Sequence, residues 1–291
     1  MDRPAHAPDR HQQHLLRHGL SGRLAGVHGH RRCEAGDHPD RFYYAAGGNT
    51  LNSLIQQSPV SGPVPAGLIQ EFDRTAQELI AAGDVVAFGE VTALHVSYEP
   101  RHSFEETPAN GGLFKRLADL AASRDVPIDF HMDAVEQTMA TPEFFLKASG
   151  NNPPRLQANI AAFEELLAYN RNARIVWAHV GRDTTGAMTP TLVRRLLQAH
   201  SNLYIQIAPQ LGPLGTSNSI VDDLGVVRPD WTILLLEFPD RAVLGSDTFH
   251  TGERERAMED CQRFLQQLPS DLARKIGCEN PGRIYKLGGG C

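Results

Sequence analysis

Four side chains of the kinds that bind divalent metals or transfer protons each follow a short apolar run. Glu90 follows VVAFG, His131 follows PIDF, His179 follows IVWA, and Asp247 follows VLGS. A lone histidine at a strand end is more often a hydrogen-bonded core residue, and a lone carboxylate there often caps the next helix. Two imidazoles and two carboxylates that converge would instead suit Zn²⁺ or Mn²⁺. Their coincidence on four runs predicts a metal or catalytic site.

The runs that carry these residues have the length of strands and alternate with segments of helical periodicity. The expected strands are 42–46, 84–90, 126–130, 174–178, 203–207 and 242–246. The expected helices are 66–82, 112–122, 155–170, 190–200, 229–238, 253–267 and 269–275. This alternation predicts a parallel α/β sheet, and the carboxyl ends of such strands form the functional edge. Periodicity leaves both an eight-stranded barrel and a doubly wound open sheet possible.

Charge and composition limit the classes of protein to which this chain can belong. The formal net charge is −6, which gives no support to a general binder of nucleic acid or of anionic membranes. No apolar run approaches the roughly 20 residues of a membrane span, and no apolar leader opens the chain. The four cysteines lie far apart, without zinc-ribbon or CxxC spacing. We therefore expect a reduced, cytoplasmic protein that acts on a small molecule.

The first forty residues differ from the rest of the chain. They hold seven of the thirteen histidines and six arginines, and they contain no Ile, Phe, Tyr or Trp. Such a composition offers little with which to build a core, so we expect residues 1–40 to be poorly ordered and residues 41–291 to form the domain. The same bias would also suit out-of-frame translation of GC-rich DNA.

The motifs VVAFGEVTALH, VPIDFHMD, RIVWAHVG and AVLGSDTFH, with the terminal ENPGRIYKL, resemble the amidohydrolase-related type of the amidohydrolase superfamily over residues 42–287. The resemblance implies a (β/α)₈ TIM-type barrel whose strands four, five, six and eight supply the metal site. His131 and His179 match the histidine ligands of strands five and six, and Asp247 matches the aspartate of strand eight. Glu90 stands on strand four, where many relatives carry a carboxylated lysine and some branches a glutamate.

The resemblance is incomplete at the N-terminus. In the family, strand one ends in a His-x-His pair of metal ligands, and the candidate pair here is His28 and His30. His30 lies twelve residues before Phe42, which is too few for a loop, a crossover helix and a second strand. Barrel strands one and two are therefore expected to be incomplete or missing. An uncovered strand edge of this kind favours a homo-oligomer.

Further polar residues follow the candidate ligands. His95 is a candidate pocket residue, and a loop histidine in water is its alternative. Asp133, Arg182 and Asp183 are candidates to orient the metal-binding histidines, and loop salt bridges are their alternative. The segments 91–110 and 208–228 are rich in Pro, Gly and Ser, as is typical of loops that cover a substrate.

Together these features predict a metal-dependent hydrolase of an amide, lactone or ester. The metal would acidify a bound water and polarise the substrate carbonyl, and Asp247 would accept the proton of that water. Decarboxylation on the same site is an alternative within the superfamily. TatD-like deoxyribonucleases have a similar order of ligands, but the acidic charge balance argues against a nuclease. A second alternative is a catalytically impaired barrel without the ligands of strand one.

Overall fold

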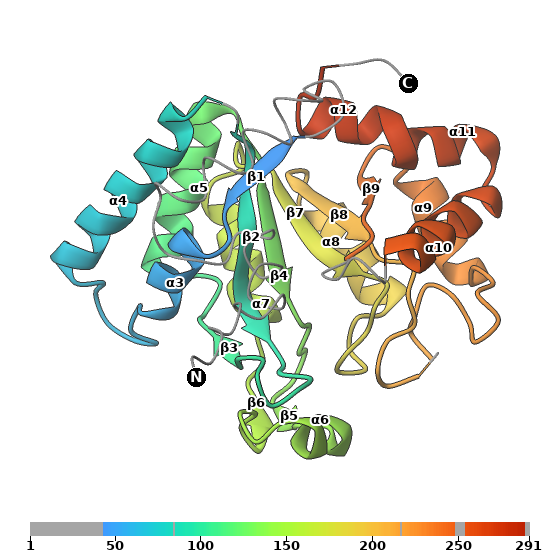
Figure 1. Ribbon diagram of the computed structural model, residues 1–291, viewed down its shortest axis with the longest axis horizontal. Helices are drawn as coiled ribbons and strands as arrows, with labels where there is room; N and C mark the ends of the chain where they lie inside the picture. The colour runs from blue at the N-terminus through green and yellow to red at the C-terminus, as the bar shows by residue number, and fades with distance from the viewer. Residues whose placement is uncertain (1–42, 84, 216, 248–253, 289–291) are drawn as a thin grey trace, which may run out of the picture.

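The computed structural model describes residues 43–83, 85–215, 217–247 and 254–288. All six expected strands are present in one sheet, in the order β1-β2-β4-β7-β8-β9, and each pair of neighbours is parallel. They are β1 (Tyr44–Gly47), β2 (Val85–His95), β4 (Ile128–Met132), β7 (Ile175–Val180), β8 (Leu203–Ile207) and β9 (Ala242–Leu244). Chain order and spatial order agree, as in a barrel wound in one direction (Figure 1).

Helices connect the strands. They are α3 (Thr50–Gln56), α4 (Ala66–Ala81), α5 (Gly112–Arg124), α6 (Glu143–Ala148), α7 (Ile160–Tyr169), α8 (Pro190–Ala199), α9 (Pro229–Glu237), α10 (Arg254–Gln266), α11 (Ser270–Arg274) and α12 (Asn280–Ile284). Most of them flank the sheet, whereas α6 lies beyond one end of it beside β5 (Met139–Ala140) and β6 (Arg155–Leu156), and α11 and α12 lie at the opposite end (Figure 1). The start of α8 shows how local sequence determines where a helix begins. The Thr189 side chain accepts a hydrogen bond from the amide of Leu192 at 3.1 Å, and Pro190 occupies the first turn.

Two elements depart from the expected boundaries. Strand β2 continues to His95 because the two-residue strand β3 (Glu105–Glu106) pairs antiparallel with its end. The helix expected over 155–170 begins only at Ile160. Its first residues instead form β6 (Arg155–Leu156), which pairs with β5 (Met139–Ala140). Leu156 is fully buried in that pair, so a tertiary contact accounts for the apolar residue that had suggested an earlier helix start.

Aromatic side chains fill the space between the sheet and α5 and α7. Phe130 on β4 stacks on Phe163 of α7, with ring centroids 5.1 Å apart, and meets Phe114 of α5 edge-on at 5.2 Å. Trp177 on β7 packs against Phe163 at 5.4 Å and donates its indole N–H to the carbonyl of Met132 at 2.9 Å. All four rings are buried, so this cluster fixes β4 against β7.

The C-terminal segment ties distant strands together at the amino end of the sheet. Asn280 of α12 is buried and donates to the carbonyls of Pro239 and Ala242, next to β9, at 2.9 and 2.8 Å. The Tyr285 hydroxyl donates to Asp129 of β4 at 2.5 Å. Within the described residues β1 and β9 are the two edges of the sheet, and α12 lies between them at this end (Figure 1). Residues 1–40, with His28 and His30, lie outside the described residues.

Among the helices that the structure describes, none is both long and apolar enough to cross a membrane.

Candidate metal centre

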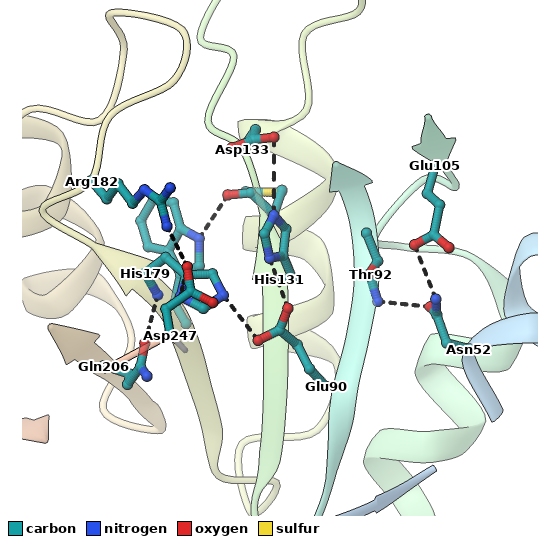
Figure 2. Close-up of polar contacts among 12 residues, drawn as sticks. Asn52, Glu90, Thr92, Glu105, His131, Asp133, His179, Arg182, Gln206 and Asp247 are labelled. Carbon is teal, nitrogen blue, oxygen red and sulfur yellow. Dashed lines mark hydrogen bonds and ion pairs between the residues drawn. The ribbon is translucent and has the colours of Figure 1, made fainter. Parts of the chain in front are cut away.

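Three of the four predicted ligands converge on three neighbouring strands, with His131 and His179 near the carboxyl ends of β4 and β7 and Glu90 in the middle of β2, which continues past the expected strand end to His95. Glu90 of β2 lies between the two histidines (Figure 2). One carboxylate oxygen is 2.8 Å from Nδ1 of His131 on β4, and the other is 3.0 Å from Nε2 of His179 on β7. One donor atom from each residue lies within 4.8 Å of the others. The arrangement can therefore hold one ion between three strands.

The close approach of β2 and β4 at this point depends on Gly89. This glycine has φ +145°, and a Cβ atom there would lie 2.7 Å from both the Cβ and the carbonyl oxygen of Asp129. Any other residue would push the strands apart. Because Gly89 precedes Glu90, its missing side chain lets the carboxylate reach His131.

Asp133 lies on the side of the His131 ring opposite to Glu90. Its Oδ2 accepts the amide of Val96 at 2.8 Å and lies 4.0 Å from Nε2 of His131. The hydroxyl of Thr184 donates to its other oxygen. At 4.0 Å the carboxylate is within ion-pair distance of the ring but outside hydrogen-bond distance, so Asp133 flanks His131 on the side away from Glu90.

His179 is positioned through its backbone. Its amide donates to Oε1 of Gln206 on β8 at 2.8 Å, and its φ of +60° is one that residues other than glycine rarely adopt. The side chain of Gln206 occupies the space beside Gly245. A Cβ atom at position 245 would lie 1.6 Å from Nε2 of Gln206, so this position requires glycine. Sequence reasoning missed Gln206. The available signal was a polar residue inside the apolar run LYIQI.

Asp247 lies beside the three converging ligands rather than among them. Its Oδ2 is 3.7 Å from Nδ1 of His179, on the side away from Glu90, and forms an ion pair with Arg182 (Figure 2). Its φ is +43°, also in the left-handed region. Such conformations in residues other than glycine cluster at functional sites. The Arg182 side chain thus pairs with the fourth candidate ligand, whereas its contact with His179 is a backbone hydrogen bond from the Arg182 amide to the His179 carbonyl at 3.0 Å.

His95 and Asp183 have different surroundings. The His95 ring lies 4.3 Å from that of His131 and 4.3 Å from that of His102, so it flanks the candidate centre. Burial, followed by the charge of His131, lowers the pKa of His95 well below its usual value. Asp183 is buried and accepts the amides of Thr185 and Gly186 at 3.2 and 3.0 Å, so it shapes its own loop.

Electrostatics at the centre favour added positive charge. The Glu90 side chain is 39% exposed, whereas those of His131 and His179 are 9% and 13% exposed. Burial alone would lower the pKa of His131, but the charges of Glu90 and Asp133 outweigh it and raise this pKa to about 10. Desolvation opposes ionisation of Glu90, yet the two histidines hold its pKa well below the usual value.

A second carboxyl group lies beneath the centre. Asp129 is two residues before His131 on β4, and it accepts the Tyr285 hydroxyl at 2.5 Å. Burial raises its pKa to about 7, against the opposing hydrogen bond from Tyr285. Sequence reasoning did not single out this pair. A lone acidic residue inside the apolar run PIDF was the available signal.

The donor set fits a divalent metal. Two histidines and one glutamate are a set used by catalytic zinc, which leaves a further position for water or substrate. Nδ1 of His179 is buried and accepts or donates no hydrogen bond among the described residues, and it faces Oδ2 of Asp247 at 3.7 Å. Glu90, His131 and His179 would therefore hold the ion. The raised pKa of His131 shows that the carboxylates around it favour positive charge at this position, and a divalent cation would supply that charge.

Several solved structures are similar to this chain. An uncharacterised TIM-barrel protein from Bordetella bronchiseptica superposes with a TM-score of 0.53 at 14% identity, covering 88% of this chain and 70% of that one. An amidohydrolase from Burkholderia multivorans with bound zinc has a TM-score of 0.43 at 12% identity, over 87% and 76% of the two chains. A dihydroxybenzoic acid decarboxylase from a Polaromonas species with bound manganese gives 0.47 at 14% identity, over 90% and 74%.

No curated protein matches the chain at the level of sequence. The family model described as "Amidohydrolase" does match it, over residues 51–287. That interval includes all of the described strands except β1, and it includes each of Glu90, His131, His179 and Asp247. The Bordetella bronchiseptica protein, whose TM-score is above 0.5, is a TIM-barrel protein. The chain therefore belongs to the amidohydrolase family.

Proposed function

We propose that the protein is a metal-dependent hydrolase that cleaves an amide, a lactone or an ester of a small molecule. One observation carries the proposal: ligand atoms of Glu90, His131 and His179, on three neighbouring parallel strands, lie within 4.8 Å of one another. Zn²⁺ is the proposed ion, with Mn²⁺ as the alternative. A divalent ion at this position polarises a carbonyl and makes water more acidic.

The neighbouring residues have distinct proposed roles. Asp133 holds the His131 ring in place, and Gln206 holds the backbone of His179. Asp247 is the proposed general base, because its carboxylate is the next acidic group along the edge of the sheet and is 10% exposed. It would take a proton from the attacking water and return it to the leaving group. The acidic net charge supports a small-molecule substrate rather than a nucleic acid.

The test is an activity screen followed by Asp247→Asn. The parent chain, loaded with Zn²⁺ or Mn²⁺, is screened on lactones, esters and amides. The variant keeps the shape of the side chain but cannot accept a proton, so turnover should fall by about 10²–10⁴-fold while most of the metal is retained. Asp240→Asn is the matched control, because Asp240 is exposed and pairs only with Lys275 among the described side chains. Unchanged turnover in Asp247→Asn would contradict the role of Asp247.

The same screen separates the alternatives. A decarboxylase would release CO₂ from 2,6-dihydroxybenzoate and would leave lactones, esters and amides intact. A catalytically impaired barrel would bind metal or lose it without turnover on any of these compounds. Elemental analysis of the purified chain provides the independent measurement, since about one or two equivalents of metal are expected for an enzyme of this kind.

A further inference from the structure

The pairing of β2 with its neighbours is irregular around Glu90. On one side, the pairing with β1 ends where Gly47 lies opposite Gly89. On the other side, the register between β2 and β4 shifts between Phe88 and Val91, as in a β-bulge. A bulge interrupts the ladder of hydrogen bonds and gives a side chain a new direction. The sheet alone therefore holds the backbone around Glu90 less firmly than that of a regular strand.

Two side chains of α3 bind the strand two residues after Glu90. Oδ1 of Asn52 accepts the amide of Thr92 at 2.9 Å, and Nε2 of Gln56 donates to the carbonyl of Thr92 at 2.7 Å. Figure 2 shows Asn52 between Thr92 and Glu105. One helix thus offers the acceptor and the donor that a neighbouring strand would otherwise supply at this residue.

These two side chains are themselves held in place. Asn52 is 7% exposed, and its Nδ2 donates to Oε2 of Glu105 on β3 at 3.0 Å. The hydroxyl of Thr107 donates to Oε1 of Gln56 at 3.2 Å. An amide whose donor and acceptor are both bound keeps one orientation, because turning it over would break both hydrogen bonds. The contacts therefore fix α3 against β2.

The position of Thr92 affects two of the candidate ligands. Thr92 lies opposite His131 in the register of β2 and β4, and it follows Glu90 by two residues on the same strand. Zinc needs its ligand atoms at about 2.0–2.2 Å, and a site loses quality when its ligands move by about 0.5 Å. A displacement of β2 at Thr92 would change the separation of Glu90 and His131 on that scale.

We propose that Asn52 and Gln56 are positioning residues that hold Glu90 at the distance from His131 that a shared metal ion requires. The inference rests on the proposed metal-dependent function, and it assigns part of the metal affinity to α3. Neither side chain belongs to the three converging donors. Both act through the backbone of β2, so their loss weakens metal binding while every ligand is still present.

The experiment measures Zn²⁺ affinity by competition with a chromophoric chelator, and it needs no turnover. Asn52→Leu and Gln56→Met keep the approximate size of each side chain and remove its hydrogen-bonding atoms. Each variant should bind Zn²⁺ about 10–100-fold more weakly than the parent, as for other residues that support a ligand. The visible spectrum of Co²⁺ bound in place of zinc reports the geometry of the ligands, and it should change in both variants.

Two controls carry the same substitutions away from β2. Asn202 is 5% exposed and donates to the carbonyls of Leu167 and Ala173, at 3.1 and 3.0 Å, on the side of the sheet where β7 begins. Asn202→Leu should lower stability and leave Zn²⁺ affinity unchanged. Gln57 is exposed and donates to the carbonyl of Ser53 in its own helix at 2.9 Å. Gln57→Met should behave like the parent.

A double variant separates hydrogen bonding from packing. Asn52→Asp with Glu105→Gln leaves the net charge unchanged and keeps an acceptor for the amide of Thr92. It also restores the hydrogen bond between positions 52 and 105 with donor and acceptor exchanged. The double variant should therefore bind Zn²⁺ as tightly as the parent.

The outcomes distinguish this inference from the proposed function. Parent-like Zn²⁺ affinity in both Asn52→Leu and Gln56→Met overturns the inference and leaves the proposed function standing. A loss that the double variant does not recover, or an equal loss in Asn202→Leu, assigns the effect to packing or to general stability and also overturns the inference. A parent chain that binds no metal overturns both.

Discussion

Asp129→Asn tests whether the carboxyl group beneath the candidate metal centre holds a proton near neutral pH. Burial raises the pKa of Asp129 from 3.8 to about 7. The folded state therefore binds this proton more tightly than the unfolded state does. The stability that the proton confers is fully present below pH 3.8, and it is lost as the pH rises through about 7.

The size of the effect follows from the two pKa values. Between about pH 5 and about pH 8, ionisation of Asp129 should lower the free energy of unfolding by about 2.6 kcal/mol. Asparagine does not ionise, and its Oδ1 can still accept the hydrogen bond from Tyr285. The pKa of His131 is also raised, so its contribution to the free energy of unfolding falls over the same pH range, but it falls equally in parent and variant. The difference between parent and variant therefore isolates Asp129.

The assay is denaturant unfolding of parent and variant at both pH values, with a chelator present to remove metal. The stability of Asp129→Asn relative to the parent should increase by about 2–3 kcal/mol from the lower pH to the higher one. Asp240→Asn is the control, since its side chain is 58% exposed and should show no comparable change. Equal pH dependence in parent and Asp129→Asn would refute the reasoning.

Three further outcomes are expected. His131→Ala and His179→Ala should each weaken Zn²⁺ binding by more than about 100-fold, because losing a ligand costs more than losing a residue that only supports a ligand. His200→Ala is the control and should leave Zn²⁺ binding unchanged. Full metal content in His131→Ala and in His179→Ala would mean that the metal site lies elsewhere. Gly245→Ala should displace Gln206 and weaken Zn²⁺ binding by about 10–100-fold, whereas Gly67→Ala, with open space around it, should not; equal affinities would remove Gln206 from the site. Phe163→Ala should cost about 3–5 kcal/mol by denaturant unfolding, and Phe144→Ala, at 50% exposure, should cost under about 1 kcal/mol; equal losses would contradict the assigned core.

Local patterns were sufficient for the six parallel strands, for most of the longer helices and for the edge that carries the site, but not for the short elements such as α3, α6 and β3. Strands such as VPIDF and RIVWA are short, apolar and bounded by turn residues, and their alternation with amphipathic helices leaves a parallel sheet as the way to bury them. Because parallel strands share one carboxyl edge, Glu90, His131 and His179 were expected together, and they are together. The family resemblance was needed to choose a barrel, because periodicity does not distinguish closed from open sheets.

Contacts between residues distant in sequence decided the rest. Leu156 had suggested an earlier helix start, but it is buried in a strand pair with Met139. The partners of Asp247 and Asp129 are Arg182, 65 residues away, and Tyr285, 156 residues away. The sequence determined which side chains reach the functional edge, because strand period and chain direction are local properties. Which of them touch was decided by the tertiary structure, because those pairings depend on register between strands and on close approaches such as that of Gly89 to Asp129.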